Sequence, residues 1–468
     1  MKSVSLITGG LSFLLSACSG GGGSFDVDDV SNPSSSKPRY QDDTSNQRTK
    51  SNLDQLSIPS LGGGMKLVAQ NIHPKSSKEP SLLNDYSVLT DLSLIMKDVK
   101  NNNNGDTPIG SIDEPNATKP NENHHGQKYV YSGLYYIPSW RKTDPSKKKY
   151  YAGYYGYAFY YGNKTATNLP VSGVAKYKGT WSFITATENR KRYSLFSNDS
   201  GQGYSKRSAI PTDIDLEVEN SETKEKGLVS EFSADFGTKK LKGELFYTQR
   251  KTNNQEYKKE KLYDIDANIY SNRFRGKVIP KEPKSKDHPF TSEGTLEGGF
   301  YGPDGEELGG KFLADNNRVF GVFSAKETEE TKKEALSKET LIDGKLITFK
   351  RTDAKTNATA STAASTAANT TTDVKTDDKN FKTEDISSFG EADYLLIDNY
   401  PVPLLPENAG DFISSKHHKV GDKTYKVEAC CKNLSYVKFG MYYEDKPTKD
   451  KNNTNQTEQY HQFLLGHR

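Results

Sequence analysis

The residue with the clearest chemical role is Cys18, which follows a short apolar segment near the N-terminus. Lys2 precedes that segment, two glycines interrupt it, and small residues lead directly to the cysteine. This order predicts a secretory signal over residues 1–17, with Cys18 as a lipidation site; a short buried helix is the alternative. Because each buried methylene contributes about 0.8 kcal/mol, several acyl chains would anchor the protein stably. Ser19 at the next position favours delivery to the outer membrane.

Two histidine pairs and one cysteine pair are the other residues whose types permit metal or redox chemistry. His124-His125 and His417-His418 lie in polar sequence, and neighbours on an extended chain point to opposite faces, so each pair is a poor chelate. We therefore predict solvated loops, no metal site and no cofactor. Cys430 and Cys431 have Cα atoms about 3.8 Å apart across a trans peptide, below the usual disulfide range, which leaves a structural disulfide and free thiols both open. No catalytic triad spacing or paired carboxylate motif stands out, so an enzyme is the least expected class.

Charge and composition exclude further classes of function. Lys and Arg total 64 against 61 Asp and Glu, with both signs interspersed and no long basic block. Nucleic-acid binding therefore has no electrostatic support. With three cysteines in 468 residues, stability must come from packing rather than from a disulfide framework. Residues 18–52 are rich in Gly, Ser, Asp and Asn, which is typical of a flexible tether.

Alternating apolar and polar residues dominate the segment 171–330. Eight runs show the period of two, which predicts strands with one buried and one wet face. Eight is also the number at which an antiparallel sheet closes into a small barrel, and small residues alternating with aromatics predict a filled interior. Charges such as Lys242 and Asp266 at outward positions exclude a barrel in lipid. On their inner faces the runs begin at or near Ala175, Leu228, Leu241, Tyr263, Phe274, Leu296, Phe312 and Val319.

Two tyrosine-rich runs, Tyr129–Tyr136 and Tyr154–Tyr161, precede this segment and flank a Lys-rich loop. We interpret them as two strands of a small open sheet. The first run recurs at Tyr436–Tyr443, where it shares Tyr, Val, Gly, Tyr and Tyr, five of eight positions. A stretch rich in Ala, Thr, Asn, Lys and Asp separates the copies and predicts a linker. A second barrel should follow this copy and does not, so an apolar face would be uncovered, and we expect poor order from about residue 380 onward.

Three separated motifs carry a resemblance that covers essentially the whole chain. They are Cys-Ser-Gly-Gly-Gly-Gly-Ser-Phe-Asp at Cys18–Asp26, the glycine-rich Gly298–Gly310, and Glu428–Cys431 with Tyr436–Gly440. The sequence resembles the transferrin-binding protein B family, surface lipoproteins of Gram-negative bacteria that take iron directly from host transferrin. The resemblance implies two lobes, each with a handle sheet beside an eight-stranded barrel, and a binding function rather than an enzymatic one.

The expected fold is all-β: a handle sheet plus an eight-stranded antiparallel β-barrel, with a second partial handle domain. Cys18 would hold the chain at the cell outer membrane, lipid-anchored and surface-exposed, with no other contact to the membrane. The expected divisions are 1–17 signal peptide, 18–52 anchor tether, 53–170 N-lobe handle, 171–330 N-lobe barrel, 331–380 linker with a low-complexity segment, and 381–468 partial C-lobe handle without its barrel.

The resemblance further implies that the N-lobe binds host transferrin, preferring the iron-loaded form, and hands it to the integral outer-membrane transferrin-binding protein A. Iron travels with transferrin, so no metal ligand is expected here. The resemblance implies a transferrin surface formed by handle loops and by the barrel loops at the end that faces them. Tyr, Trp and Arg dominate interface energetics, although strand alternation turns roughly half of each run toward the handle's own core. The candidate contacts are Tyr135, Tyr136, Trp140, Arg141, Tyr154, Tyr155, Tyr157, Phe159 and Tyr160.

A lipocalin-like carrier of small apolar ligands is the alternative function for the barrel. Large inward residues such as Trp181, Phe232, Phe300 and Phe323 argue against an empty interior. A void on the order of several hundred cubic ångströms would suit a drug-sized ligand. The interior of the barrel therefore discriminates between the two functions.

Overall fold

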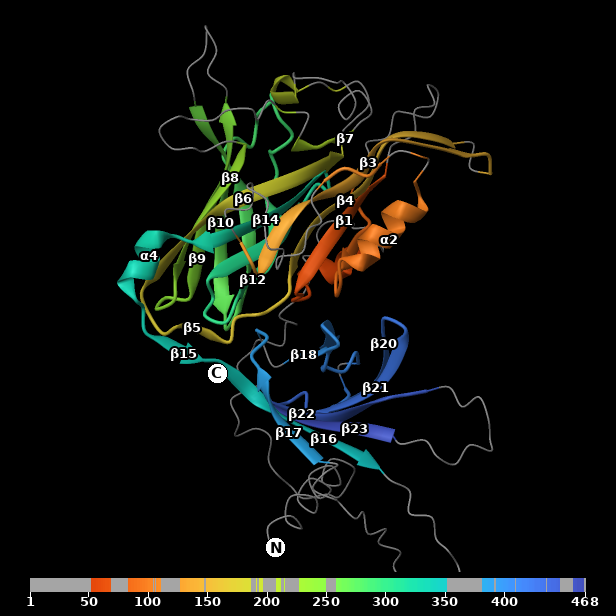
Figure 1. The fold of residues 1–468 in the computed structure, drawn as a ribbon, viewed down its shortest axis with the longest axis vertical. Coiled ribbons are helices and arrows are strands. Elements are labelled where there is room, and N and C mark those ends of the chain that lie inside the picture. The colour runs from red at the N-terminus through yellow and green to blue at the C-terminus, as the bar shows by residue number, and fades with distance from the viewer. Residues whose placement is uncertain are drawn as a thin grey trace, which may run out of the picture.

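The structure, a computed structural model, confirms an almost entirely β architecture (Figure 1). Among the described residues, two short α-helices accompany the strands, α2 (Ser93–Asn101) and α4 (Glu329–Glu334). Neither these nor any other helix within those residues is long and apolar enough to span a bilayer. The described residues are 52–68, 83–103, 105, 107–110, 127–146, 149–186, 191, 193–196, 208–211, 214, 227–249, 258–351, 381–390, 393–408, 410–434, 436–446 and 458–466.

Eight antiparallel strands form a closed barrel, as the alternating runs predict. Consecutive strands pair from the second to the eighth, the second pairs with the first, and pairing of the last strand with the first closes the ring. A two-residue strand, β7 (Ser208–Ala209), extends the first strand at one end. The barrel strands are β6 (Val174–Ala186), β8 (Leu228–Asp235), β9 (Lys240–Gln249), β10 (Lys258–Tyr270), β11 (Arg273–Pro280), β12 (Gly294–Tyr301), β13 (Glu307–Ala314) and β14 (Val319–Glu327).

Aromatic side chains fill the barrel, because the inward positions of the strands alternate between small and large residues. Trp181 and Phe183 pack against Phe290, and the ring centroids of Phe183 and Phe290 are 5.0 Å apart in an edge-to-face arrangement. Phe232 lies 5.1 Å from Phe323. The indole N–H of Trp181 donates to the carbonyl of Phe246 at 2.8 Å. The barrel is therefore a packed core.

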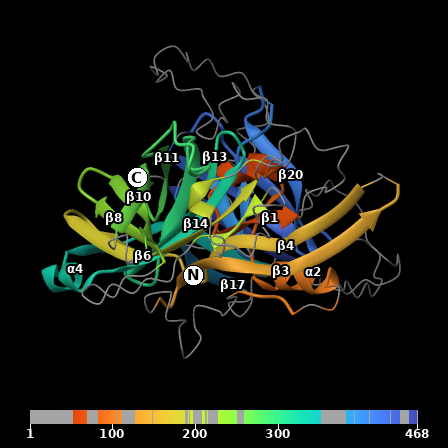
Figure 2. The ribbon, with the colours of Figure 1, turned by 90° about the horizontal axis from the view of Figure 1, so that it is seen from above.

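The first sheet contains four antiparallel strands in the order β2-β1-β4-β3. Its long central hairpin is the pair of tyrosine-rich runs, now β3 (Val130–Asp144) and β4 (Lys149–Gly162). The outer two strands are β1 (Gly62–Val68) and β2 (Tyr86–Val88), and a 3₁₀ turn, η2 (Asn52–Ser57), precedes them. One face of this sheet lies on the barrel, and α2 covers the other face (Figures 1 and 2).

The contact with the barrel corrects the expectation that every barrel strand has a wet outer face. On β9 and β10 the outward side chains, such as Lys242 and Asp266, are exposed as expected. On β14, however, the outward side chains of Phe320 and Val322 are fully buried against the first sheet. Alternation of side chains along a strand cannot by itself distinguish a solvent-exposed face from a face that another sheet covers.

The second sheet contains six strands in the order β17-β16-β23-β22-β21-β20. A hairpin of β18 (Tyr394–Ile397) and β19 (Tyr400–Pro403) covers one of its faces. Residues 329–340 lead from the barrel to this sheet through α4 and β15 (Lys338–Thr340), which pairs with β5 (Asn168–Pro170). The strands of the sheet are β16 (Ile342–Arg351), β17 (Phe381–Ser387), β20 (Ile413–Val420), β21 (Lys423–Cys430), β22 (Val437–Glu444) and β23 (Glu458–Gly466).

Two expectations about this part of the chain are wrong. The interval 331–380 was expected to be linker throughout, yet β16 is an inner strand of the second sheet, paired with both β17 and β23. Poor order was expected from about residue 380, yet the described residues beyond 381 form a sheet with its own apolar core around Val427, Tyr442 and Phe463. The β18–β19 hairpin supplies the cover that the sequence pattern did not reveal.

Candidate functional site

The structure buries eight of the nine candidate contact residues, which corrects their assignment as surface contacts. Their exposed fractions lie between 0% for Tyr160 and 8% for Tyr135, and only Arg141 is exposed. The reason is that both faces of the first sheet are covered, so both sets of alternating side chains enter a core. The buried candidates are Tyr135, Tyr136, Trp140, Tyr154, Tyr155, Tyr157, Phe159 and Tyr160.

Three of these candidates lie on the face that packs against the barrel. Tyr136 and Tyr154 form an edge-to-face pair with ring centroids 5.6 Å apart. The Tyr160 hydroxyl lies 3.0 Å from the carbonyl of Ser60 and 3.2 Å from a carboxylate oxygen of Glu297 on the barrel. Burial and the Glu297 charge raise the pKa of Tyr160 well above its ordinary value. These tyrosines join the sheet to the barrel and are not available to a partner.

A buried ionic cluster underlies this junction. The Glu297 carboxylate on β12 forms ion pairs with Arg273 on β11 and Lys311 on β13, and all three side chains are at most 4% exposed. The Arg273 guanidinium also donates to the hydroxyl of Tyr301 at 3.1 Å and to the carbonyl of Ser60. The cluster was not predicted, because three charged residues among glycines and apolar residues have no characteristic spacing in the sequence.

The glycine-rich hallmark Gly298–Gly310 serves the same junction. Four of its glycines, Gly298, Gly299, Gly309 and Gly310, lie within β12 and β13 and not in the turn between them. A Cβ at Gly309 would lie 2.5 Å from Val130 on the first sheet, and a Cβ at Gly299 would lie 2.1 Å from the Arg273 guanidinium. Glu307, in the same motif, accepts three backbone N–H groups from residues 128–130 at 2.6–2.9 Å. The motif therefore makes room for the sheet and fixes its position.

The opposite face of the first sheet is closed by α2. Asp98 on this helix accepts hydrogen bonds from the hydroxyls of Tyr155 and Tyr157 at 2.9 and 2.7 Å, and lies 3.3 Å from the Lys66 ammonium. Burial, followed by the bond to Asp98, raises the pKa of both tyrosines. The helix was not predicted, although its apolar residues Leu92, Ile95, Met96 and Val99 have helical spacing.

Beyond these covered regions, β3 and β4 continue as a two-stranded arm, residues 140–153 (Figure 2). Pairing of β4 with β1 ends at Val68↔Tyr155, so β1 does not extend along the arm. Its basic tip, residues 141–149, carries five Lys and Arg residues against one Asp. Arg141 and Lys142 are exposed. The arm is the part of the tyrosine-rich hairpin that remains accessible.

The barrel offers no support for a carrier of apolar ligands. Its interior positions are occupied by packed aromatic rings. A groove of about 870 Å³ lies outside the barrel, between α4 and strands β6, β8, β9 and β10. Outward-facing charges such as Lys178, Glu231 and Asp266 line it, and such a lining does not suit an apolar molecule.

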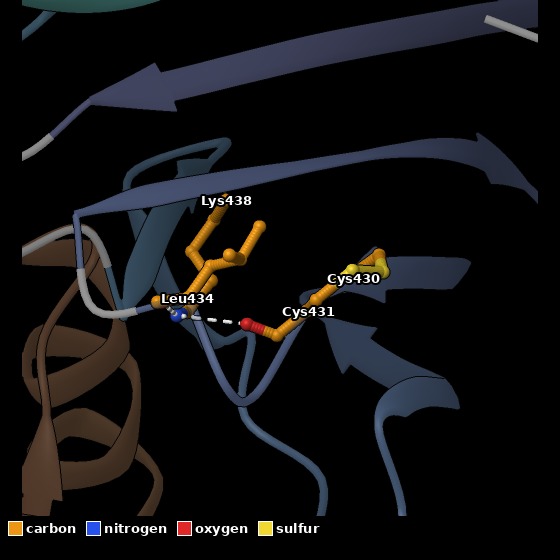
Figure 3. Close-up of a disulfide and its surroundings, with 4 residues drawn as sticks. All are labelled: Cys430, Cys431, Leu434 and Lys438. Carbon is orange, nitrogen blue, oxygen red and sulfur yellow. Dashed lines mark hydrogen bonds between the residues drawn. A yellow bond between two sulfur atoms is a disulfide. The ribbon is translucent and has the colours of Figure 1, made fainter. Parts of the chain in front are cut away.

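Cys430 and Cys431 form a disulfide at the end of β21 (Figure 3). The buried Lys438 ammonium donates to the carbonyls of Cys431 and Leu434, the first at 3.1 Å, and so orders the turn that follows. The two histidine pairs and Cys18 are the other residues of chemical interest in the sequence. His417 and His418 lie in β20 rather than in a loop, while Cys18 and His124-His125 lie outside the described residues. Within the described ranges no group of three or more His, Cys, Asp or Glu side chains is arranged to hold a metal ion.

Three family models match consecutive parts of the chain. The model described as the N-lobe handle of transferrin-binding protein B matches residues 39–166, and the model for the C-lobe and N-lobe β-barrels matches residues 169–327. The model for the C-lobe handle domain matches residues 339–468. This last match begins just before β16, which is the first strand of the six-stranded sheet along the chain.

Curated relatives and solved structures agree with these models. Transferrin-binding protein B of Haemophilus influenzae (strain Rd) is 72% identical over 475 residues, covering 100% of this chain and 73% of the relative. The protein of the same name from Neisseria meningitidis serogroup B is 32% identical, covering 92% of this chain and 69% of the relative. A crystal structure of isotype 1 from serogroup B Neisseria meningitidis superposes with a TM-score of 0.61 at 26% identity, covering 87% of this chain and 72% of that one. A structure of an intact relative with N and C lobes gives a TM-score of 0.57 at 25% identity, covering 88% and 67%.

Proposed function

Because the chain belongs to the transferrin-binding protein B family, whose members are binding proteins and not enzymes, we propose that it binds host transferrin through its N-lobe, preferring the iron-loaded form. The observation that carries this proposal is the high identity, over the whole chain, to relatives named for that activity. The packed barrel and the covered sheet suit a rigid mount for a large partner.

The basic tip of the arm is the proposed contact surface of the first sheet. Eight of the sequence candidates lie in the core. At the tip, by contrast, Arg141 and Lys142 are exposed, the sequence has an excess of positive charge, and the strands project away from the barrel (Figure 2). Charged groups at the rim of an interface act mainly on the association rate and on its salt dependence. The tip would therefore meet an acidic region of transferrin.

Anchoring at the outer membrane through lipidated Cys18, and delivery of transferrin to the integral transferrin-binding protein A, complete the proposal. The support is the order of charged, apolar and small residues before Cys18. Replacing Cys18 by Ser should move the chain from the membrane fraction to the soluble fraction after cell fractionation. Retention of the variant in the membrane fraction would contradict the lipid anchor.

Capture of transferrin by the immobilised full chain is the direct test of binding. Iron-loaded and iron-free transferrin should be offered separately, with serum albumin as the negative control. We expect capture of the loaded form in clear excess over the iron-free form. Equal capture of both forms would refute the preference for iron, and capture of neither would refute the binding function.

A paired charge substitution tests the contact surface. The double variant Arg141→Gln and Lys142→Gln should weaken transferrin binding about five-fold and reduce its salt dependence. The matched control, Lys240→Gln with Lys242→Gln, removes two exposed charges from the barrel surface and should leave the affinity unchanged. If both double variants behave alike in surface plasmon resonance, the arm is not the contact.

A further inference from the structure

Trp140 lies at the base of the arm, where the sheet narrows to two strands. The β3–β4 pairing is interrupted by a bulge between Ile137 and Trp140 and resumes at Trp140↔Gly153. A two-stranded ribbon is only marginally stable by itself. The arm therefore needs an attachment at its base if its tip is to hold one direction.

The Trp140 side chain supplies that attachment. Its ring packs on Tyr155, with centroids 4.7 Å apart, and its indole N–H donates to the carbonyl of Asn102 at 3.1 Å. Asn102 is the residue that caps the C-terminal end of α2. The side chain is only 3% exposed, so it reaches the helix and not the solvent.

The contacts of Trp140 form a closed network with α2 and Tyr155. The Asn102 side-chain amide donates to the carbonyl of Asp98 at 2.9 Å, and the Asp98 carboxylate accepts the Tyr155 hydroxyl. The Tyr155 ring in turn packs against the Trp140 ring. The direction of the arm is thus tied to α2 at two points, one through the indole N–H and one through Tyr155.

From this geometry we infer that Trp140 is a positioning residue, which directs the basic tip toward transferrin without touching it. The inference rests on the proposed function of the arm. Its physical basis is preorganisation: a tip that already points in the binding direction loses less conformational freedom when the complex forms. A contact residue would need solvent exposure, which Trp140 lacks.

The chain offers a matched control, because it contains two tryptophans and both are buried donors to a backbone carbonyl. Trp140→Phe keeps an aromatic ring and removes the N–H that reaches Asn102. Trp181→Phe removes the equivalent bond to Phe246 inside the barrel. Both substitutions should lower the stability of the protein, but only Trp140→Phe should change the mobility of the arm.

Two measurements are made on the full chain. A spin label at Ser146→Cys, in a Cys18→Ser background, reports the mobility of the tip, since Ser146 is exposed and Cys430 and Cys431 are joined. Surface plasmon resonance reports transferrin affinity. Trp140→Phe should increase label mobility and weaken affinity about five-fold, whereas Trp181→Phe should change neither. Asp98→Asn, which loosens the same helix without altering Trp140, should increase label mobility as well.

The outcomes separate the inference from the function beneath it. Unchanged label mobility in Trp140→Phe, or equal mobility in both tryptophan variants, overturns the positioning role. Increased mobility with unchanged affinity also overturns it, provided that Arg141→Gln with Lys142→Gln does weaken binding. If that charge variant binds normally, the proposed contact surface fails instead, and the label mobility alone then decides whether Trp140 positions the arm.

Discussion

The two handle sheets contain the same tyrosine-rich motif but bury it differently. In the first sheet, one face packs on the barrel and the other lies under α2, so Tyr135 and Tyr136 are both buried. In the second sheet, the β18–β19 hairpin covers the face that contains Tyr442, while Tyr443 on the other face is only partly buried and Leu464 is 52% exposed. A tyrosine run therefore indicates a strand, and its neighbours decide which faces are buried.

The largest expected effect concerns the ionic cluster at the junction between the first sheet and the barrel. Glu297→Gln leaves Arg273 and Lys311 buried without their carboxylate, which should lower the free energy of unfolding by about 3–5 kcal/mol. Urea denaturation followed by tryptophan fluorescence measures this free energy, since Trp140 lies in the first sheet and Trp181 in the barrel. The control Asp385→Asn removes an exposed pair with Lys345 in the second sheet and should cost below about 1 kcal/mol. Equal costs would mean that the cluster does not hold the junction.

The equivalent tyrosines of the two copies give a direct comparison. Tyr136→Ala removes a ring from the interface with the barrel and should cost about 3 kcal/mol. Tyr443→Ala removes a partly buried ring that contacts Tyr460 and should cost about 1 kcal/mol. Hydrogen exchange of β3–β4 and of β22–β23 measures each sheet separately. A larger loss of protection in the second sheet would reverse the comparison.

The smallest expected effect is a difference in acid sensitivity. Burial lowers the pKa of His461 on β23, whose ring stacks on Tyr442 with centroids 4.4 Å apart. A neutral histidine in the fold takes up protons on unfolding, so the second sheet should lose stability as the pH falls below about 6.5, until it reaches the lowered folded-state pKa. Hydrogen exchange of β23 between pH 7 and pH 5 should show this loss, by less than about 1 kcal/mol. His461→Phe should remove this contribution; an unchanged pH profile in that variant would contradict its assignment to His461.

Much of the fold could be predicted from the sequence because its signal is local. Alternation along each barrel strand depends only on the inward and outward directions of successive side chains, so the eight strands follow from runs such as Leu241–Tyr247. The second sheet was harder to predict. Its strand β16 is separated from β17 by the Ala- and Thr-rich stretch, and a low-complexity segment within a hairpin resembles a linker between domains.

The candidate site was less predictable, because exposure depends on contacts distant in sequence. Tyr155 and Tyr157 are polar aromatic residues of the kind found at interfaces, yet here their hydroxyls bind Asp98, 57 and 59 residues away in the chain. Tyr160 is paired with Glu297, 137 residues away. Arg141, the one candidate that stays exposed, lies next to the Lys-rich loop, and this excess of charge was a signal available in the sequence.

The barrel and the six-stranded sheet differ in whether they have edge strands, which matters where many copies of the protein lie close together. The barrel closes on itself, so its ring presents no unpaired strand to another molecule. In the part of the chain that the structure describes, the six-stranded sheet ends in β17 and β20, and neither strand pairs with a further strand on its outer side. Both of these strands carry charges, including Lys382 and Glu384 on one and Lys416 and Lys419 on the other, and charged edges discourage intermolecular strand addition. Molecules packed densely side by side should therefore remain separate and not join through their sheets.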